Sequence, residues 1–466
     1  MKSSLAAIQP WISQATTANA AAGGLGDVLF DGVSTDSRNV SAGNLFVALR
    51  GERFDAHAFL NDVAARGVAA VVAEELPAGF TLPAIVVPDT RAALAQIAAG
   101  WRKQFTMPVI GVTGSNGKTT VKEMIAAILN AAFGAEQCMA TRGNLNNEIG
   151  VPLTVFRMQD GMKAAVVELG MNHPGEIAVL ASVAKPTVGL VNNAQREHQE
   201  FMASVEAVAR ENGAVIQSLD AAGTAVFPAD DEFTSLWRGF AADAGCKVMT
   251  FGLDGDADVS ATYAASAFGS ELTVSAQGKT FKLKLSAAGV HNVRNALAAT
   301  ACALAAGIPA DAVIRGLESF APVNGRLQRK TGKHGALVVD DTYNANPDSV
   351  RAAIDVLASL PAPRVLVLGD MGEVGNDGPA FHEEVGAYAK SRGIERLLAL
   401  GDLARHSARA YGGEAEHFGD VAALNAKVDS LAASGTTVLV KGSRFMKMER
   451  VVQHLTASAD AQQGGH

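Results

Sequence analysis

Apolar, β-branched runs alternate along much of the chain with segments that have the apolar spacing of helices. From about residue 107 to 322, predicted strands and helices follow one another, which is typical of a parallel sheet with crossover helices. The alternation starts again at about residue 323, where four apolar runs each end in polar residues: ALVVDD, RVLVLGDMG, RLLALGD and TVLVKGS. The pattern therefore predicts a central α/β unit followed by a separate, doubly wound, Rossmann-like α/β unit.

Two regions depart from this simple alternation. Residues 1–106 mix short strands, predicted at 44–51 and 69–74, with a helix over 55–67. Residues 223–285 contain shorter strands separated by turns, and we expect them to form an antiparallel flank on the central sheet. Because 466 residues exceed one ordinary core, we predict an α/β protein of three domains: 1–106, 107–322 and 323–466.

Composition and charge narrow the class of protein. Hydrophobic residues make up 48% and charged residues 18%, which favours a globular protein. The net charge of −8, without a basic block, argues against a nucleic-acid partner. The longest apolar run, 296–308, is far shorter than the ~20 residues of a membrane span. The amino terminus lacks the apolar core of a signal peptide, and three widely spaced cysteines without a CxxC pair indicate reduced thiols in a cytoplasm.

The segment from Met107 to Leu129 has the order strand, glycine-rich loop, helix. In the loop Gly114-Ser115-Asn116-Gly117-Lys118-Thr119, glycines let backbone N–H groups converge, while the helix N-terminus and Lys118 add positive charge. The Thr119 hydroxyl is the group that holds Mg²⁺ in such loops. The strict motif has a glycine where this chain has Val112. A turn with a surface lysine is the alternative, but the flanking strand and helix favour a phosphate-binding loop.

Polar residues also follow two other predicted strands of the central unit. The strand AAVVE ends in Glu168, and the strand TVGLV leads to Asn192, Asn193 and, after a short loop, His198. Because ligands bind beyond the carboxyl ends of strands in such sheets, we expect these side chains beside the phosphate loop. There they would bind metal or position water. The alternative for each is a surface or helix-capping role.

Three further residues are candidates for nucleotide contacts. Asn292 and Asn295 lie on one face of a predicted helix, where their amides suit the edge of adenine; helix capping by Asn292 is the alternative. Arg326 lies at a domain junction, where it could reach phosphates across a closing cleft or simply be solvated. No GxGxxG follows a strand of the third domain, which argues against a dinucleotide cofactor.

Seven motifs, taken in order, resemble those of the Mur ligases: GVTGSNGKTT, GNLNNEIGVPLT, VELGMNHPGE, HNVRNALAA, NGR, DDTYNANPDS and LGDMGEVG. The resemblance extends over essentially the full chain. It implies an amino-terminal domain for a UDP-sugar, a central ATPase domain and a carboxy-terminal domain that binds the incoming amine and closes over ATP. It also implies an ATP- and Mg²⁺-dependent ligase of peptidoglycan synthesis that adds D-alanyl-D-alanine to a UDP-N-acetylmuramoyl-tripeptide through an acyl phosphate. We expect a cytoplasmic monomer.

The resemblance further implies roles for individual residues. Lys118 would contact the β and γ phosphates, Thr119 and Glu168 would hold one Mg²⁺, and His198 with Glu168 would help to hold a second. Further ATP contacts would come from Gly114, Ser115, Asn116, Gly117, Thr120, Asn292, Asn295, Arg326 and, at the ribose, Asp341. Substrate contacts would come from Ser34, Asp36, Ser37, Arg38 and Arg50 for the uridine diphosphate, from Asn144, Asn146 and Asn147 for the muramoyl peptide, and from Asn344 and Lys441 for the dipeptide.

One position departs from the family pattern. Fourteen residues after His198 the family usually has a lysine, carbamoylated by CO₂, whose new carboxylate completes the second metal site. This chain has Asn212 there, and an amide brings no negative charge. We hypothesise that the protein works without the carbamate, with Asn212 or Glu211 taking its place.

Three other functions are close enough to need exclusion. The family member that adds a diamino acid usually has a DNPR motif, which this chain lacks. Folylpolyglutamate synthase has a similar ATPase domain but no amino-terminal UDP-sugar domain. A nucleotide-driven binding module would hydrolyse ATP without needing an acceptor.

Overall fold

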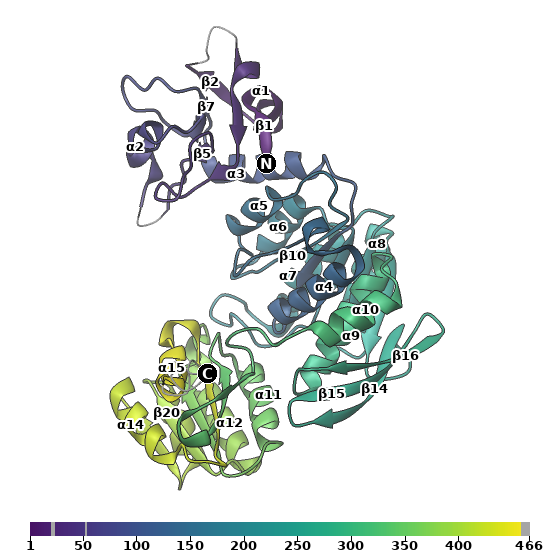
Figure 1. Ribbon diagram of the computed structural model, residues 1–466, viewed down its shortest axis with the longest axis vertical. Coiled ribbons are helices and arrows are strands. Elements are labelled where there is room, and N and C mark those ends of the chain that lie inside the picture. The colour runs from purple at the N-terminus through teal and green to yellow at the C-terminus, as the bar shows by residue number, and fades with distance from the viewer. Residues whose placement is uncertain (20–23, 52–53, 458–466) are drawn as a thin grey trace, which may run out of the picture.

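The computed structural model describes residues 1–19, 24–51 and 54–457, and shows three bodies arranged along one long axis (Figure 1). The N-terminal body lies at one end, the body that contains the phosphate loop in the middle, and the C-terminal body at the other end. In the described part of the chain, no helix is long and apolar enough to cross a bilayer.

The N-terminal body is built on a five-stranded sheet of order β2-β7-β6-β5-β4. The expected strands at 44–51 and 69–74 are confirmed as β5 (Leu45–Val47) and β6 (Ala70–Ala73). The expected helix is a 3₁₀ turn at Ala56–Phe59 that continues into α2 (Leu60–Ala65). The remaining elements are β1 (Lys2–Ser4), α1 (Leu5–Ile8), β2 (Thr16–Ala18), β3 (Leu29–Asp31), β4 (Val33–Ser34), β7 (Ala84–Val86) and α3 (Thr90–Arg102).

The central body has a nine-stranded sheet of order β16-β15-β14-β13-β12-β11-β8-β10-β9. Its strands are β8 (Val109–Thr113), β9 (Cys138–Ala140), β10 (Ala164–Glu168), β11 (Val188–Val191), β12 (Thr224–Pro228), β13 (Lys247–Gly252), β14 (Val259–Ser266), β15 (Gly269–Ala276) and β16 (Lys279–Leu285). Pairing is parallel from β9 to β14 and antiparallel among β14, β15 and β16.

The antiparallel flank was therefore predicted to begin too early. Strands β12 and β13 belong to the parallel part, and helix α8 (Thr234–Ala244) forms the crossover between them. Within the central sheet, only the β14–β15 and β15–β16 pairings are antiparallel, as expected for that flank. The buried Trp237 holds α8 in place: its ring lies beside Phe227 of β12, and its indole N–H donates to the carbonyl of Ala209.

Helices cover both faces of the parallel part because successive strand residues point to opposite sides. Ile110 and Val112 pack on one face with α4 (Lys118–Phe133), α9 (Val290–Ala305) and α10 (Ala310–Ser319). Val109 belongs to the core of the other face, which holds α5 (Gly150–Val155), α6 (Glu176–Ala184), α7 (Val205–Gln217) and α8. The phosphate loop is thus anchored between two apolar layers.

The N-terminal and central bodies share one hydrophobic core. Buried residues of the first sheet and of the central helices form a single cluster, with α3 between them. At the end of α3, Arg102 donates hydrogen bonds to the carbonyl groups of Ala184 and Lys185, and the Trp101 indole donates to that of Met158. Burial lowers the pKa of Arg102. These contacts fix the two bodies to each other.

The C-terminal body is doubly wound, as predicted, with a six-stranded sheet of order β17-β18-β22-β19-β20-β21. Its strands are β17 (Gln328–Thr331), β18 (Leu337–Asp341), β19 (Arg364–Gly369), β20 (Arg396–Leu400), β21 (Ala415–Phe418) and β22 (Thr437–Lys441). Its helices are α11 (Pro347–Ala358), α12 (Gly378–Ser391), α13 (Ala404–Tyr411), α14 (Val421–Leu431) and α15 (Glu449–Thr456). The pattern predicted a single helix between β20 and β22. The structure has two helices there, α13 and α14, with the unpredicted strand β21 between them. The boundaries at 106 and 322 remain predictions.

We expect Gly386→Ala to destabilise the C-terminal body. Helix α12 packs on α13 so closely there that a Cβ atom would lie 2.2 Å from the carbonyl oxygen of Ser407, a backbone atom. Overpacking of this kind costs about 1–3 kcal/mol in free energy of unfolding. Gly239→Ala, in α8 with open space around it, is the matched control and should stabilise by up to about 1 kcal/mol. Denaturant unfolding measures both, and equal effects would contradict the packing argument.

Candidate active site

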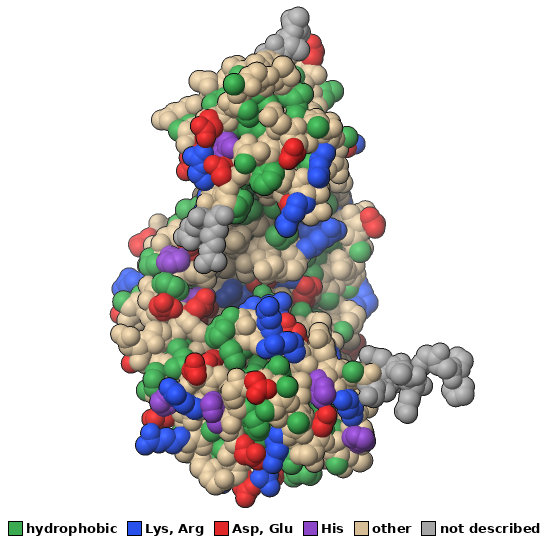
Figure 2. Space-filling view, turned by 90° about the vertical axis from the view of Figure 1, so that its left-hand side faces the viewer, with side chains coloured by type: hydrophobic (Ala, Val, Ile, Leu, Met, Phe, Trp, Pro, Cys, Tyr) green, Lys and Arg blue, Asp and Glu red, His purple; other side chains and the backbone are tan. Residues whose placement is uncertain are grey.

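A cavity of about 1030 Å³ is lined by residues of all three bodies. Arg91 comes from the N-terminal body, Asn116 and Lys118 from the phosphate loop, and Tyr343 and Arg444 from the C-terminal body. The space-filling view shows the surface hollowed at mid-height, with Lys and Arg side chains beside the hollow (Figure 2). Basic groups around a hollow suit a ligand that carries phosphates.

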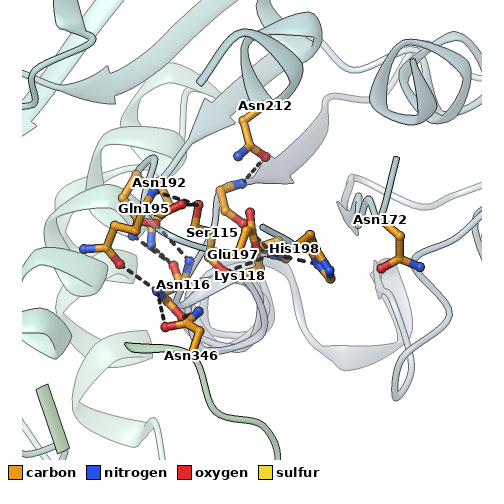
Figure 3. Close-up of polar contacts among 12 residues, drawn as sticks. Ser115, Asn116, Lys118, Asn172, Asn192, Gln195, Glu197, His198, Asn212 and Asn346 are labelled. Atoms are coloured by element: carbon orange, nitrogen blue, oxygen red, sulfur yellow. Dashed lines mark hydrogen bonds and ion pairs between the residues drawn. The ribbon is translucent and has the colours of Figure 1, made fainter. Parts of the chain in front are cut away.

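The phosphate loop joins β8 to α4, as the sequence predicted, and its glycines are structurally required. Gly114 and Gly117 have φ angles of 129° and 83°, which side chains disfavour. A Cβ atom at Gly117 would also lie 2.6 Å from Oδ1 of Asn295. The loop backbone is held by neutral amides: Asn212 Oδ1 accepts from the Gly114 N–H and Asn193 Oδ1 from the Asn116 N–H, both at 2.9 Å (Figure 3). Ser115 and Thr120 also line the cavity.

The Lys118 side chain lies back along the loop. Its Nζ donates to the carbonyl oxygens of Gly114 and Ser115 and lies 3.4 Å from Oε2 of Glu197. Glu197 is 6% exposed, and its other oxygen has no hydrogen-bond partner among the described residues. The ammonium is therefore at the place where phosphates would reach it, in contacts that a phosphate can replace.

Glu168 and Thr119 form a group that fits a hard cation. Oε1 of Glu168 accepts from the Thr119 hydroxyl at 3.1 Å and from the Asn146 amide at 2.9 Å. Glu168 is 2% exposed, yet its Oε2 has no partner within the described ranges. A buried carboxylate oxygen without a donor is unfavourable unless a cation binds there. Oxygen ligands of this kind are those that Mg²⁺ prefers.

His198, the other expected metal ligand, contacts the C-terminal body instead. Its Nδ1 lies 2.7 Å from Oε2 of Glu373, and its Nε2 lies 3.9 Å from Oε2 of Glu197. The close approach of the His198 imidazole lowers the pKa of Glu373, against the opposing effect of burial. Among the described residues, no three His, Cys, Asp or Glu side chains are grouped closely enough to hold a metal ion. His198 lines the cavity, and its role at a second metal stays a prediction.

The two asparagines of α9 belong to a row of amides that ends at the phosphate loop. The helix is capped by Gly289, so the capping role considered for Asn292 is excluded. Asn292 donates to the carbonyl of Ala288 and accepts from Asn295, which in turn accepts from Asn192 at 3.0 Å. All three asparagines line the cavity.

Residues of the C-terminal body meet the loop from the opposite side. Arg326 donates to the Thr119 hydroxyl at 2.8 Å and stacks over Tyr343, with 4.2 Å between the guanidinium carbon and the ring centroid. The solvated-linker alternative for Arg326 is thereby excluded. Lys441 binds the Asp341 carboxylate at 2.6 Å and the carbonyl of Asn344 at 2.9 Å. Asp341, Asn344 and Lys441 line the cavity.

The residues expected to bind uridine diphosphate lie outside this cavity. Asp36 accepts from the Arg38 guanidinium, which lowers the pKa of Asp36 to about 2. Arg50 pairs with Asp55 at 2.8 Å, and its carbonyl accepts from Arg91. Ser34 and Ser37 lie in the same N-terminal body. Arg91 thus links this region to the cavity, where Asn144, Asn146 and Asn147 also lie.

The structure corrects the expectation for Asn212 and Glu211. Asn212 is buried, and its carbonyl oxygen is used by the phosphate loop. Glu211 accepts from the N–H groups of Gly175 and Ile177 at the start of α6, both at 2.8 Å. Neither residue lines the cavity. The idea that either replaces a carbamate as a metal ligand is wrong, because both side chains support backbone elsewhere.

Gln195 and Glu197 are among the cavity residues that the sequence analysis missed. The Gln195 N–H donates to Ser115 Oγ, and its side chain accepts from Asn116 at 2.6 Å. Both follow strand β11, which ends at Val191, so their position beyond a strand was the available signal.

Three models of Mur ligase domains match this chain: the "Mur ligase family, catalytic domain" over residues 29–102, the "Mur ligase middle domain" over 112–303 and the "Mur ligase, glutamate ligase domain" over 325–444. The UDP-N-acetylmuramoyl-tripeptide–D-alanyl-D-alanine ligase of Escherichia coli K12 is 41% identical over 433 residues, which cover 92% of this chain and 94% of that protein.

Solved structures of Mur ligases are also similar to this chain. A crystal structure of MurF from Acinetobacter baumannii superposes with a TM-score of 0.91 at 32% identity, covering 97% of this chain and 98% of that one. MurF from Thermotoga maritima in complex with ADP has a TM-score of 0.84 at 27% identity, covering 94% and 99% of the two chains. The protein therefore belongs to the Mur ligase family.

Proposed function

We propose that the protein is an ATP-dependent ligase that adds D-alanyl-D-alanine to UDP-N-acetylmuramoyl-tripeptide, giving the pentapeptide precursor of peptidoglycan with ADP and phosphate. The observation that carries the proposal is one cavity in which three features meet: the phosphate loop, the buried Glu168 carboxylate with one oxygen that has no partner among the described residues, and the C-terminal body. We call the C-terminal body the acceptor domain, because it would bind the amine that accepts the acyl group. The similarity to the Escherichia coli ligase supports the choice of substrates. We also propose that it works as a monomer in the cytoplasm.

In the first step, an oxygen of the tripeptide's terminal carboxylate attacks the γ-phosphorus of ATP while the bond to ADP breaks. The chain's task is to position both groups and to offset their negative charge. Lys118 and Arg326 supply cations from opposite sides of the loop, and Asn292 and Asn295 offer amides to adenine. Thr119 and Glu168 would hold Mg²⁺, which neutralises phosphate charge when bound.

In the second step, the free amine of the dipeptide attacks the acyl carbon, loses a proton and forms the amide as phosphate leaves. The C-terminal body would present the dipeptide, since Asn344 and Lys441 line its side of the cavity. Closing the cavity also keeps water from the acyl phosphate. The N-terminal residues Ser34, Asp36, Ser37, Arg38 and Arg50 would hold the uridine diphosphate.

Phosphate release from ATP tests the function directly. We expect release only when both UDP-N-acetylmuramoyl-tripeptide and D-alanyl-D-alanine are present, with pentapeptide formed in equal amount. The control for the family member that adds a diamino acid is the same assay with the UDP-N-acetylmuramoyl-dipeptide and the diamino acid as the two substrates. Turnover without an acceptor would instead identify a nucleotide-driven module.

Lys118→Met should reduce the rate of ligation by at least about 10²-fold, because it removes a cation that neutralises charge developed in the transition state. Methionine keeps most of the side-chain volume, so the thermal unfolding midpoint should stay close to that of the wild type. The measurement is kcat for pentapeptide formation with both substrates saturating. Ligation at a near-normal rate would overturn the role of the loop.

The ligase should also work without a carbamoylated lysine. Asn212 holds the Gly114 N–H through a neutral amide and has no amine for CO₂ to modify. Added bicarbonate should therefore leave kcat unchanged, and mass spectrometry of the peptide containing Glu211 and Asn212 should find no carbamate. Strong activation by bicarbonate, with a carbamoylated lysine near the cavity, would show the opposite.

A further inference from the structure

The segment Gln195–His198 has side chains that contact two different bodies in turn. Gln195 and Glu197 contact the phosphate loop, at Asn116 and Lys118. Arg196 and His198 contact the C-terminal body. Figure 3 shows Gln195, Glu197 and His198 around the loop, with Asn346 of the C-terminal body beside Asn116. Four consecutive residues thus join the nucleotide side of the cavity to the acceptor domain.

Arg196 makes the strongest of these contacts. Its guanidinium donates to Asp348 at 2.6 Å and to both oxygens of Glu384, at 2.6 and 3.0 Å. Its backbone N–H donates to Asp348 as well, and its guanidinium carbon lies 5.4 Å from the ring centroid of Phe381. Paired, charge-assisted bonds of this kind are roughly twice as strong as neutral ones, and these side chains are half-buried. The two carboxylates raise the pKa of Arg196, so it stays charged.

The two acidic partners lie on different helices of the C-terminal body. Asp348 is in the first turn of α11, and Glu384 is in α12. The cap of α11, Asn346, also exchanges a hydrogen bond with Asn116 of the phosphate loop at 2.9 Å. Arg196 therefore binds α11 and α12 at the same time, next to the point where Asn346, the cap of α11, contacts the phosphate loop.

Few apolar contacts join the C-terminal body to the central body near Arg196. The main apolar cluster under α11 includes only Ala288 from the central body among its buried members, with Phe268 packed against it. This contrasts with the continuous core that unites the first two bodies. The position of the C-terminal body must then depend heavily on polar contacts.

We propose that Arg196 is a positioning residue that holds the C-terminal body, and with it the incoming dipeptide, over the phosphate loop. The proposal rests on the proposed function for its kinetic consequence but not for its structural one. Without Arg196, Asp348 loses its ion-pair partner at the interface, whereas Glu384 keeps Arg351 at 3.0 Å. The acceptor domain then spends less time in the arrangement that presents the amine.

The test compares Arg196→Met with Arg351→Met in the full chain. Arg351 is the matched control, because it binds Glu384 and stacks on Tyr388 within the C-terminal body. We expect R196M to raise KM for D-alanyl-D-alanine about tenfold or more, with a much smaller change in KM for ATP. Small-angle X-ray scattering should show a larger radius of gyration for R196M than for R351M. Arg196→Lys should be intermediate, since an ammonium cannot pair with both carboxylates in the same geometry.

Asp348→Asn gives a second route if R196M fails to fold, because asparagine keeps the shape of the first turn but removes the charge. It should raise KM for the dipeptide in the same direction. Equal KM values and equal radii of gyration for R196M and R351M would overturn the proposal. If the wild type does not join the dipeptide at all while R196M still expands, the proposed function fails and the positioning role stands.

Discussion

The structure depends on a glycine-rich loop that neutral side chains hold in place. Gly114 and Gly117 adopt positive φ angles, and the backbone between them is fixed by amides from β11's end and from α7. Amides can bind loop N–H groups without adding a negative charge that would repel a polyphosphate. The same choice explains why Asn212 is useful where it stands: it gives up any possibility of carrying a carbamate but supports the first turn of the loop.

The three bodies are joined by contacts of opposite physical character. One hydrophobic core runs from the first sheet through α3 into the central helices, so those two bodies are packed together continuously. The C-terminal body has its own cores on the two faces of its sheet and meets the central body mainly through hydrogen bonds, such as those to the loop, and ion pairs, such as those of Arg196. Polar contacts exchange readily with water and with ligands, whereas a packed core does not. Motion of the acceptor domain is therefore the form of flexibility that this architecture permits.

The features that could be predicted from the sequence are those that a local pattern of residues determines. The order of strand, loop and helix around Lys118 is local, and so is the placement of Glu168 at a strand end. The flank was misplaced because the strands on either side of α8 are short and look alike whether they pair parallel or antiparallel. The role of Arg196 could not be predicted, since its partners lie 152 and 188 residues further along the chain. A charge pair has no periodicity, so only the folded chain brings it together.

Lys118 and Arg326, the two cations beside the phosphate loop, are engaged with partners that a phosphate can displace. Lys118 is 3.4 Å from Glu197, longer than the ~2.7–2.9 Å of a strong charge-assisted bond, and its other partners are carbonyls. Arg326 is held by a hydroxyl rather than a carboxylate. A phosphate offers each of them a better acceptor. By contrast, Arg196 is held by two carboxylates at full strength. The cations expected to meet ATP are therefore bound mainly by neutral oxygens, whereas the cation proposed to position the C-terminal body is bound by two carboxylates.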